Sequence, residues 1–285
     1  MAENKPGPSG KGGGSRIDLA TIGGLVVFFG GILSGFLLEG GNFAQILQGT
    51  AALIVFGGTI GAVMVTTPLG VLKRAAGALV SVFVERQQAP AAVIEEIIGY
   101  ATKARKNGIV SLEGDAEAVS DRFLRKALNL AVDGTDLQEI RKMMDLEMAM
   151  EEHRSETEAK VFEAAGGYAP TIGIIGAVLG LIQVMKNLSN IEEVGKGIAV
   201  AFVATIYGVG SANILFLPAG TKIRARAQAA LQIKELMLEG VAGIVEGLNP
   251  KLIRIKLEAY VHETASTGKQ KAGRARAGTA AEAAS

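Results

Sequence analysis

The chain has 285 residues, of which 49% are hydrophobic and 20% are charged, and its formal net charge is +1. Because the mean hydropathy is +0.33 despite this many charges, apolar and charged residues must be segregated along the chain. There is no Cys, which excludes disulfides, thiolate zinc sites and thiol chemistry, and a net charge near zero gives no indication of nucleic-acid binding.

Four stretches contain no Asp, Glu, Lys or Arg and are long enough to cross a membrane. They are residues 19–38, residues 40–72 with an apolar core at 46–65, residues 164–185 and residues 197–221. A helix needs about 20 apolar residues to cross about 30 Å of hydrocarbon. We therefore expect transmembrane helices over residues 17–38, 43–66, 167–187 and 196–218.

The ends of the chain have a different composition. Residues 1–16 are rich in Gly, Pro and Ser, and residues 266–285 are of low complexity, so we expect both segments to be disordered. The first apolar stretch is too long for the apolar region of a cleavable signal peptide, and no small-residue cleavage site stands out.

Positive charges flank the apolar stretches unevenly. The connection "EGGN" after the first stretch has no Lys or Arg, and the connection "KNLSNIEEVGK" has two Lys and two Glu. Basic residues gather before the first stretch and after the second and fourth, namely Lys5, Lys11, Arg16, Lys73, Arg74, Lys222, Arg224 and Arg226. Since loops rich in Lys and Arg stay inside, both termini and the long middle segment are predicted to be cytoplasmic.

The middle segment, residues 70–164, is the only sizeable block that reads as soluble. Apolar residues recur at helical spacing, which predicts helices over residues 91–108, 116–134 and 136–165. Breaks are expected at Pro90, Gly108 and Gly134, Asp136 is a candidate N-cap, and the last helix should run straight into the third span. The fold class is therefore an all-α integral membrane protein with four spans, a cytoplasmic helical domain between spans 2 and 3, and a cytoplasmic helical tail over 219–265.

The soluble parts differ in charge. Residues 85–163 hold 17 acidic and 11 basic residues, and the segment after the fourth span holds 6 acidic and 11 basic residues. Two explanations stay open: an acidic domain beside a basic tail at an anionic membrane surface, or a charged face that binds a protein partner.

Common enzyme signatures are missing. The chain has no Walker A run, no GxSxG and no HExxH, and its two histidines, His153 and His262, lie far apart on charged segments. We therefore expect no catalytic residue, no metal site and no cofactor. The spans also lack an acidic residue, and an ion site inside a membrane usually needs one. If the protein conducts an ion, the titrating group must come from another chain.

Small residues four apart mark places where helices can approach closely. One such pair lies in each span: Gly31 and Gly35, Gly57 and Gly61, Gly176 and Gly180, and Ala204 and Gly208. Pairs of this kind let backbones pack together where lipid offers no hydrophobic drive. Four pairs in one chain favour an oligomeric bundle.

Several segments together resemble the MotA/PomA family, the A subunit of the bacterial flagellar stator. The matching segments are "DLATIGGL" (18–25), "ARKNGIVSLE" (104–113), "YAPTIGIIGAVLGLI" (168–182), "VATIYGVGSANILFLP" (203–218) and "GLNPKLI" (247–253). The resemblance covers roughly residues 17–265, and its joint pattern is more specific than any single segment.

The resemblance implies a multi-pass subunit of the bacterial inner membrane. Five A subunits would surround two MotB-type subunits, each with one span, a peptidoglycan-binding domain and the membrane Asp that takes the ion. Ion flow would rotate the ring, whose cytoplasmic charges act on the rotor protein FliG. One charge crossing about 100 mV releases about 2.3 kcal/mol, comparable to the roughly 2.5–3.5 kcal/mol cost of a charge at the bilayer centre.

The resemblance also assigns residues. Arg105 and Glu113 occupy the positions of the rotor-facing charges, with Lys106 and Asp115 as weaker candidates because the acidic cluster of the sodium-type branch is interrupted here. Without the resemblance, these charges would be read as ordinary solvated helix ends.

In the membrane, the family places Pro170, Pro218 and Thr205 on the ion pathway and its coupling, and Tyr207 is a further polar candidate in span 4. The prolines are expected at the cytoplasmic ends of their spans, where proline ends a helix or makes a hinge-like position. Sodium-driven members carry Thr at the position of Ala177. Because Ala offers no oxygen ligand to a cation, we expect protons rather than Na⁺ to be transported.

Three alternatives stay open. The first is a sodium-driven stator of the PomA type. The second is an energiser like ExbB or TolQ, although those relatives have three spans. The third is a membrane scaffold without ion flux, which explains the packing glycines but not a missing carboxylate beside the polar Thr205.

Overall fold

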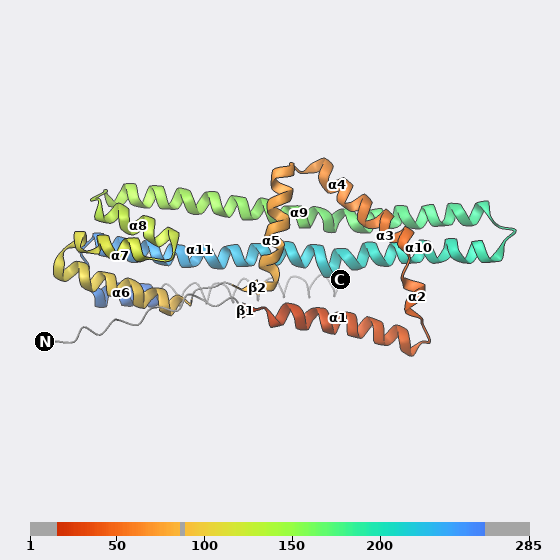
Figure 1. The fold of residues 1–285 in the computed structure, drawn as a ribbon, viewed down its shortest axis with the longest axis horizontal. Helices are drawn as coiled ribbons and strands as arrows, with labels where there is room; N and C mark the ends of the chain where they lie inside the picture. Colours follow the sequence, from red (N-terminus) through yellow and green to blue (C-terminus); the bar gives the residue numbers. More distant parts are fainter. Residues whose placement is uncertain (1–15, 86–88, 260–285) are drawn as a thin grey trace, which may run out of the picture. The chain divides into compact units, whose positions relative to one another are not determined.

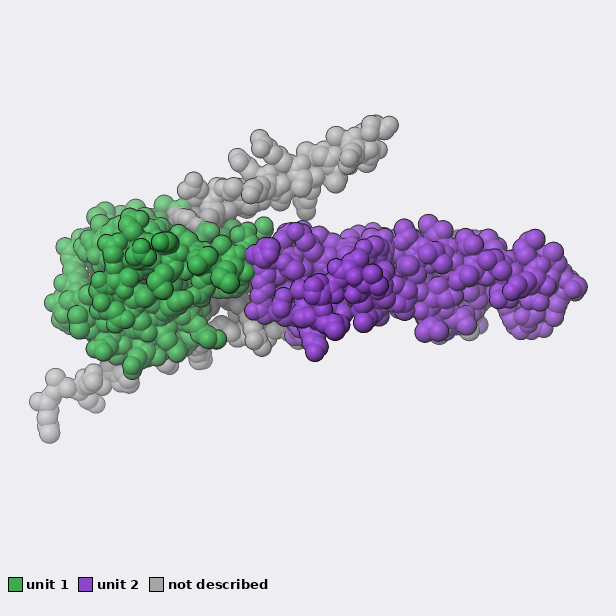
Figure 2. All heavy atoms as spheres, turned by 90° about the horizontal axis from the view of Figure 1, so that it is seen from above, with its two compact units in different colours: residues 1–14, 86–152, 228–285 green, residues 15–85, 153–227 purple. Residues whose placement is uncertain are grey.

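A computed structural model of the protein describes residues 16–85 and 89–259 (Figure 1). The expected disordered ends lie almost entirely outside these residues, as does His262. The chain divides into two compact units (Figure 2). Within the described residues, unit 1 comprises 89–152 and 228–259, and unit 2 comprises 16–85 and 153–227.

Four helices are long and apolar enough to span a membrane, as predicted. The first is α1 (Leu19–Leu38), and the second is the segment Gly49–Thr66. The third lies in α9 (Leu137–Lys186), and the fourth begins with α10 (Ile191–Ser211) in the helical stretch Ile191–Val245.

The second span is interrupted, whereas the sequence predicts one helix over 43–66. It consists of α2 (Phe43–Ile46), α3 (Gly49–Ala52), a π-helical turn η1 (Leu53–Gly57) and α4 (Gly58–Thr66). Leu47 and Gln48 are non-helical and separate α2 from α3. The periodicity of apolar residues does not reveal this break, because no Pro or charge marks it.

A short amphipathic helix and two short strands lie beside the N-terminal end of α1 in unit 2. Helix α5 (Leu69–Phe83) leads into β2 (Val84–Glu85), which pairs antiparallel with β1 (Arg16–Ile17). The backbone N–H of Asp18 continues this pairing by donating to the carbonyl of Phe83 at 3.1 Å.

Unit 1 is a bundle of short helices around one apolar core. It contains α6 (Pro90–Asn107), a 3₁₀ turn η2 (Ile109–Leu112), α7 (Glu113–Ala118) and α8 (Arg122–Val132), which pack with parts of the long helices. The largest fully buried side chains of this core include Ile97, Leu112, Leu124, Leu128, Ile140, Met144, Leu236, Met237, Ile253 and Leu257.

Local residue types explain where these helices begin and end. Pro90 is the first residue of α6, a position that needs no N–H. Gly108 and Gly134 follow α6 and α8 with φ of 81° and 76°, a conformation that favours glycine. The carboxylate of Asp136 accepts from the N–H of Gln138 at 2.8 Å, so the predicted cap of α9 is confirmed.

The predicted helix over 116–134 is wrong in one respect, because it is two helices. The chain leaves helical geometry at Val119, and the side chain of Asp121 caps α8 by accepting from the N–H groups of Phe123 and Leu124. Arg125 donates from both Nε and Nη2 to the carbonyl of Val119, which satisfies the carbonyl at the break. Ser-Asp at 120–121 is an N-cap signal that the apolar periodicity hides.

Both prolines lie within continuous helical stretches, and their predicted place at the cytoplasmic ends of their spans stays a prediction. Pro170 lies inside the unbroken 50-residue helix α9. Pro218 is the second residue of α11 (Leu217–Val245), which continues directly from α10 through a π-helical turn, η3 (Ala212–Phe216). Neighbouring helices make a proline tolerable inside a membrane helix. Both residues therefore act as local irregularities and not as helix ends.

Candidate functional site

The charged segment at the end of α6 is the first candidate site. Arg105 and Lys106 lie in the last turn of α6, and Glu113 begins α7 just beyond the 3₁₀ turn. All three are exposed, and within the described part of the chain they take part in no ion pair. Asp115 is half-buried and binds Lys103 at 2.7 Å. The three exposed charges are available to a partner, whereas Asp115 is already neutralised within the unit.

Spans 3 and 4 pack backbone against backbone through small residues. A Cβ built on Gly173 would lie 2.9 Å from the carbonyl oxygen of Ala204, and one on Gly208 would lie 2.6 Å from that of Ala169. A Cβ on Gly180 would lie 2.8 Å from the carbonyl oxygen of Gly197. We call this the glycine interface; its members are Ala169, Gly173, Gly176 and Gly180 of α9 and Gly197, Ala201, Ala204 and Gly208 of α10.

The other two small-residue pairs make no such contact in the chain. Apart from the backbone of its own helix and its chain neighbours, no heavy atom of the described residues lies within 4 Å of a Cβ built on Gly31, Gly35, Gly57 or Gly61. Helix α1 has no buried residue at all. The small residues of spans 3 and 4 thus bring these two helices into close contact, as predicted. For spans 1 and 2, close contact through small residues stays a prediction that concerns other chains.

Tyr207 makes hydrogen bonds to the backbone at the break in span 2. Its hydroxyl donates to the carbonyl of Ile46 at 2.6 Å and accepts from the N–H of Gln48 at 3.3 Å. Ile46 directly precedes the non-helical step and Gln48 is its second residue, and backbone groups inside a membrane must be satisfied by protein. The ring also lies 6.0 Å from that of Phe56. The geometry therefore gives Tyr207 a structural contact that the sequence did not suggest.

Thr205 and Ala177 lie along the helices that form the glycine interface. Thr205 is half-buried, its Cα is 3.5 Å from a Cβ built on Gly173, and its hydroxyl donates to the carbonyl of Ala201 at 3.2 Å. Ala177 follows Gly176 and is also half-buried. The chain thus offers one hydroxyl beside the interface and none at position 177.

The C-terminal end of span 4 combines a π-helical turn with a proline. Within η3, the side-chain amide of Asn213 donates to the backbone carbonyl of Val209 at 2.9 Å. Pro218, the second residue after η3, has no N–H to donate, so it cannot give the usual helical hydrogen bond to the carbonyl of Ile214. π-Helical turns inside α-helices are frequent at functional sites. Asn213, Pro218, Lys222 and Arg226 all line one cavity of about 470 Å³.

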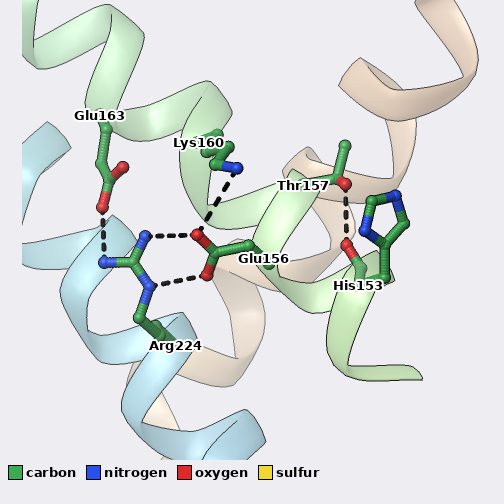
Figure 3. Close-up of polar contacts among 6 residues, drawn as sticks. All are labelled: His153, Glu156, Thr157, Lys160, Glu163 and Arg224. Atoms are coloured by element: carbon green, nitrogen blue, oxygen red, sulfur yellow. Dashed lines mark hydrogen bonds and ion pairs between the residues drawn. The ribbon is translucent and has the colours of Figure 1, made fainter. Parts of the chain in front are cut away.

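Beyond the predicted ends of spans 3 and 4, Arg224 connects α11 to α9 (Figure 3). Its guanidinium binds Glu156 through two hydrogen bonds of 2.8 and 3.1 Å and Glu163 at 2.8 Å. The bond to Glu156, followed by that to Glu163, raises the pKa of Arg224, and the bond from Arg224 lowers the pKa of Glu156. Lys160 lies 3.7 Å from Glu156. This network favours the ionised form of Glu156 and joins α11 to α9 at two carboxylates.

A second ionic cluster ties the start of α1 to α11. The carboxylate of Asp18 caps α1 through the N–H of Thr21 at 3.1 Å and binds Lys222 and, at 2.7 Å, Arg226. Lys222 also donates to the hydroxyl of Thr21 at 2.5 Å. The hydrogen bond from Lys222, and then that from the Thr21 backbone, holds the pKa of Asp18 far below its usual range. Asp18 is therefore a charged anchor for the N-terminal end of span 1.

Comparison with known proteins identifies the family. A family model described as MotA/TolQ/ExbB proton channel family matches residues 115–237, and one described as Motility protein A N-terminal matches residues 22–108. Motility protein A of Bacillus subtilis is 35% identical over 86% of this chain and 91% of its own length. This chain belongs to the MotA family.

Solved MotA-family structures agree with the fold. A structure of C. jejuni MotAB is similar with a TM-score of 0.81 and 32% identity, over 86% of this chain and 96% of that chain. The flagellar MotAB stator complex of Bacillus subtilis is similar with a TM-score of 0.78 and 34% identity, over 85% of this chain and 95% of that chain. The chain is accordingly a MotA-type stator subunit with multiple membrane spans.

Sequence reasoning missed three contacts of this MotA-family chain: the link from Tyr207 to span 2, the Arg224 network, and the Asp18 cluster. Asp18 does carry a signal, because Asp directly before an apolar helix is a preferred N-cap residue. The other two contacts join residues more than 60 positions apart in the sequence, and no local pattern predicts such pairs.

Proposed function

We propose that this MotA-family subunit carries protons inward together with a MotB-type partner, and that its cytoplasmic charges turn this flow into torque on the rotor protein FliG. In the proposed assembly, five copies surround two partner chains in the bacterial inner membrane, with both termini in the cytoplasm. The protein acts as a channel and motor subunit without enzyme chemistry.

The observation that carries this proposal is the glycine interface of spans 3 and 4. The backbones of α9 and α10 touch through glycine and alanine, so the two spans form one closely packed pair. Thr205 lies beside this interface, and the charge-free stretches of the spans hold no carboxylate. Spans 3 and 4 could thus form one wall of an ion pathway. The titrating carboxylate of that pathway would come from the single span of the MotB-type partner.

The choice of ion rests on Ala177. A methyl group at this position offers no oxygen to a desolvated Na⁺, which takes several oxygen ligands, as hard cations do. A proton needs only the carboxylate of the partner and water. The hydroxyl of Thr205 donates to the carbonyl of Ala201 in its own helix, and its oxygen keeps its capacity to accept.

Contact with the rotor is assigned to Arg105, Lys106 and Glu113. These exposed charges lie on both sides of one tight turn, in a unit whose core is packed by the surrounding helices. A rigid core below exposed charges suits a surface that must transmit force. Asp115 contributes less, because Lys103 already binds it.

Ion flux with and without the partner's membrane Asp tests the proposal. The chain is co-expressed with a MotB-type subunit whose periplasmic part is shortened to keep the pathway open, and proton uptake is measured in vesicles. We expect uptake with the intact partner and loss of uptake when the partner's membrane Asp is changed to Asn. Uptake that persists with the Asn partner would contradict the proposal, because the ion would then not depend on that carboxylate.

An energiser of the ExbB or TolQ type is less well supported than a flagellar stator. The model for the motility protein A N-terminal segment matches residues 22–108, which include the first two spans. Four helices of this chain are long enough to span, compared with three spans in those energisers.

A further inference from the structure

The cavity of about 470 Å³ along η3 and α11 has a basic end and an apolar end, and it lies within unit 2. Lys222 and Arg226 line one end, with Ala225 beside them, and Leu217 and Pro218 line the part nearer to span 4. Leu217 is 38% exposed, and Pro218 and Ala225 are also exposed. Among the described residues that line the cavity, none is acidic.

The two uncharged polar side chains of the cavity bind their own helical stretch. The hydroxyl of Thr221 donates to the carbonyl of Leu217 at 3.0 Å, and the side-chain amide of Asn213 donates to the carbonyl of Val209. Such bonds to the preceding turn are common for short polar side chains in helices. The strongest donors that the cavity offers to a ligand are therefore the ammonium of Lys222 and the guanidinium of Arg226.

Asp18 binds both cations without lining the cavity itself. Its side chain is 12% exposed, whereas that of Lys222 is 29% exposed, so the cation is the more accessible member of the pair. Lys222 also donates to the hydroxyl of Thr21. An ammonium has three N–H donors, so one remains beyond these two described partners. The cavity therefore presents positive charge, and the carboxylate that fixes the two cations is mostly covered.

The two ends of the cavity lie on either side of a membrane boundary. The charge-free stretch 197–221 ends directly before Lys222, and the charge-free stretch 19–38 begins directly after Asp18. Such stretches match the hydrocarbon core, so the charges at their ends lie at the level of the lipid headgroups. At 1.5 Å per residue, Pro218 lies about 12 Å from Arg226 along the helix. The basic end thus faces headgroups, and the apolar end faces acyl chains.

We propose that this cavity binds an anionic phospholipid, with its phosphate at Lys222 and Arg226 and an acyl chain along Leu217 and Pro218. Ammonium and guanidinium groups make charge-assisted hydrogen bonds to phosphate. Basic pockets beside transmembrane helices bind anionic lipid headgroups for this reason. Free phosphate would leave the apolar end uncovered, and a lipid without net charge would gain less from two cations. The inference depends on the membrane spans and not on the transported ion or the rotor contact.

Ala225 allows a test that leaves the Asp18 cluster intact. The full chain is purified with its MotB-type partner in detergent, phosphatidylglycerol and phosphatidylcholine with the same acyl chains are added, and the retained lipid is counted by native mass spectrometry. We expect the complex to retain phosphatidylglycerol in preference. Ala225→Glu and Ala225→Gln add side chains of equal size to the lining. The Glu variant should bind phosphatidylglycerol about fivefold more weakly than the Gln variant, roughly the effect of one charge near an anionic lipid.

A second pair of variants removes a cation. Lys222→Gln should also weaken retention of phosphatidylglycerol by about fivefold. Lys186→Gln is the matched control, because Lys186 is an exposed lysine at the end of α9 and does not line the cavity. It should leave retention nearly unchanged. Melting temperatures show whether each variant is folded, and if Lys222→Gln does not fold, the Ala225 pair decides.

Three results would overturn the inference. Equal retention of the two lipids, or equal binding of phosphatidylglycerol by the two Ala225 variants, would show that no anionic headgroup lies at the basic end. Displacement of phosphatidylglycerol by soluble glycerol phosphate would show that the cavity selects an anion without its acyl chains. A photo-reactive residue in place of Ala225 that attaches to protein and not to lipid would show that a protein segment fills the cavity. Proton uptake tests the proposed function separately from all three.

Discussion

At the residue scale, Tyr207 shows how a single hydroxyl can make an irregular membrane helix possible. The break at Leu47 and Gln48 leaves backbone groups without helical partners, and the hydroxyl of Tyr207 reaches both sides of it. Tyr207, which the sequence makes a candidate for the ion pathway, therefore also stabilises the backbone of span 2.

The change Tyr207→Phe removes this hydroxyl and keeps the ring. We expect it to destabilise the folded protein by about 1–3 kcal/mol, the cost of leaving a buried polar group unpaired. Thermal unfolding in detergent, followed by circular dichroism, measures the effect. As a control, Thr221→Val removes a hydroxyl that only donates within its own exposed helix turn, and it should change stability much less. Equal stability of Tyr207→Phe and the unchanged protein would show that the link to Ile46 contributes nothing.

The exposed charge of Arg105 belongs to the same scale. Reversing it with Arg105→Glu should reduce stall torque strongly while leaving the amount of protein in the membrane unchanged, because the side chain has no partner within its unit. Torque is read from the speed of a bead on a flagellar stub. Lys142→Glu, on an exposed position of α9, is the control with the same change of charge. Normal torque in Arg105→Glu would remove Arg105 from the rotor contact.

At the element scale, the glycine interface decides how spans 3 and 4 pack. Four small-residue pairs are visible in the sequence, and among the residues that the structure describes, Gly176 with Gly180 and Ala204 with Gly208 are the pairs that meet. The spacing of small residues predicts that helices can approach closely. It does not say which helix approaches, because that depends on the tertiary arrangement and on other copies.

A single added methyl group tests this interface. In Gly208→Ala the new Cβ would lie 2.6 Å from the backbone carbonyl of Ala169, so the helices must separate. We expect a loss of about 1–3 kcal/mol of stability, typical of overpacking. In Gly210→Ala, two residues along, the new Cβ meets only Ile214 at 3.9 Å. That variant should be neutral or slightly stabilising, since Ala favours a helix. Equal melting temperatures for the two variants would contradict the packing described for the interface.

The elements that could be predicted are those with a strong local signal. Long charge-free stretches predict the four spans, and Pro90, Gly108 and Asp136 mark helix ends that the structure confirms. The elements that could not be predicted depend on distant partners. Span 2 breaks where Tyr207 supplies hydrogen bonds, and α9 continues through Pro170 because neighbouring helices support it. Among candidate site residues, Arg105 and Glu113 are found by resemblance, whereas Arg224 has no local signature.

At the scale of the whole molecule, ion pairs join distant parts of the chain within each unit. In unit 1, Glu239 binds Arg141 and Lys256, each at 2.6 Å. The hydrogen bond from Arg141 is the main cause of a lowered pKa of Glu239, and Lys256 adds to it. Ion pairs of this kind connect α9, α11 and the helix at 250–259, which are far apart in sequence.

The lowered pKa of Glu239 gives a pH dependence with a definite sign. A carboxyl with a lower pKa in the folded state stabilises the fold above its ordinary pKa of 4.5, and this contribution is lost as the pH falls through the folded value. Glu239→Gln should therefore be less stable than the unchanged protein at neutral pH, and the difference should shrink in acid. Melting temperatures at pH 7 and below pH 4 measure this. A difference that stays constant across these values would mean that Glu239 is not held ionised by Arg141.

The most direct measurement of the central claim is the ion dependence of motor rotation driven by this chain. The chain and its MotB-type partner replace the stator of a motile bacterium, and the speed of tethered cells is followed while the ion gradients are changed. We predict that rotation persists when Na⁺ is removed and stops when a protonophore collapses the proton gradient. Rotation that needs Na⁺ and survives the protonophore would contradict a proton-driven stator with Ala177 in its pathway.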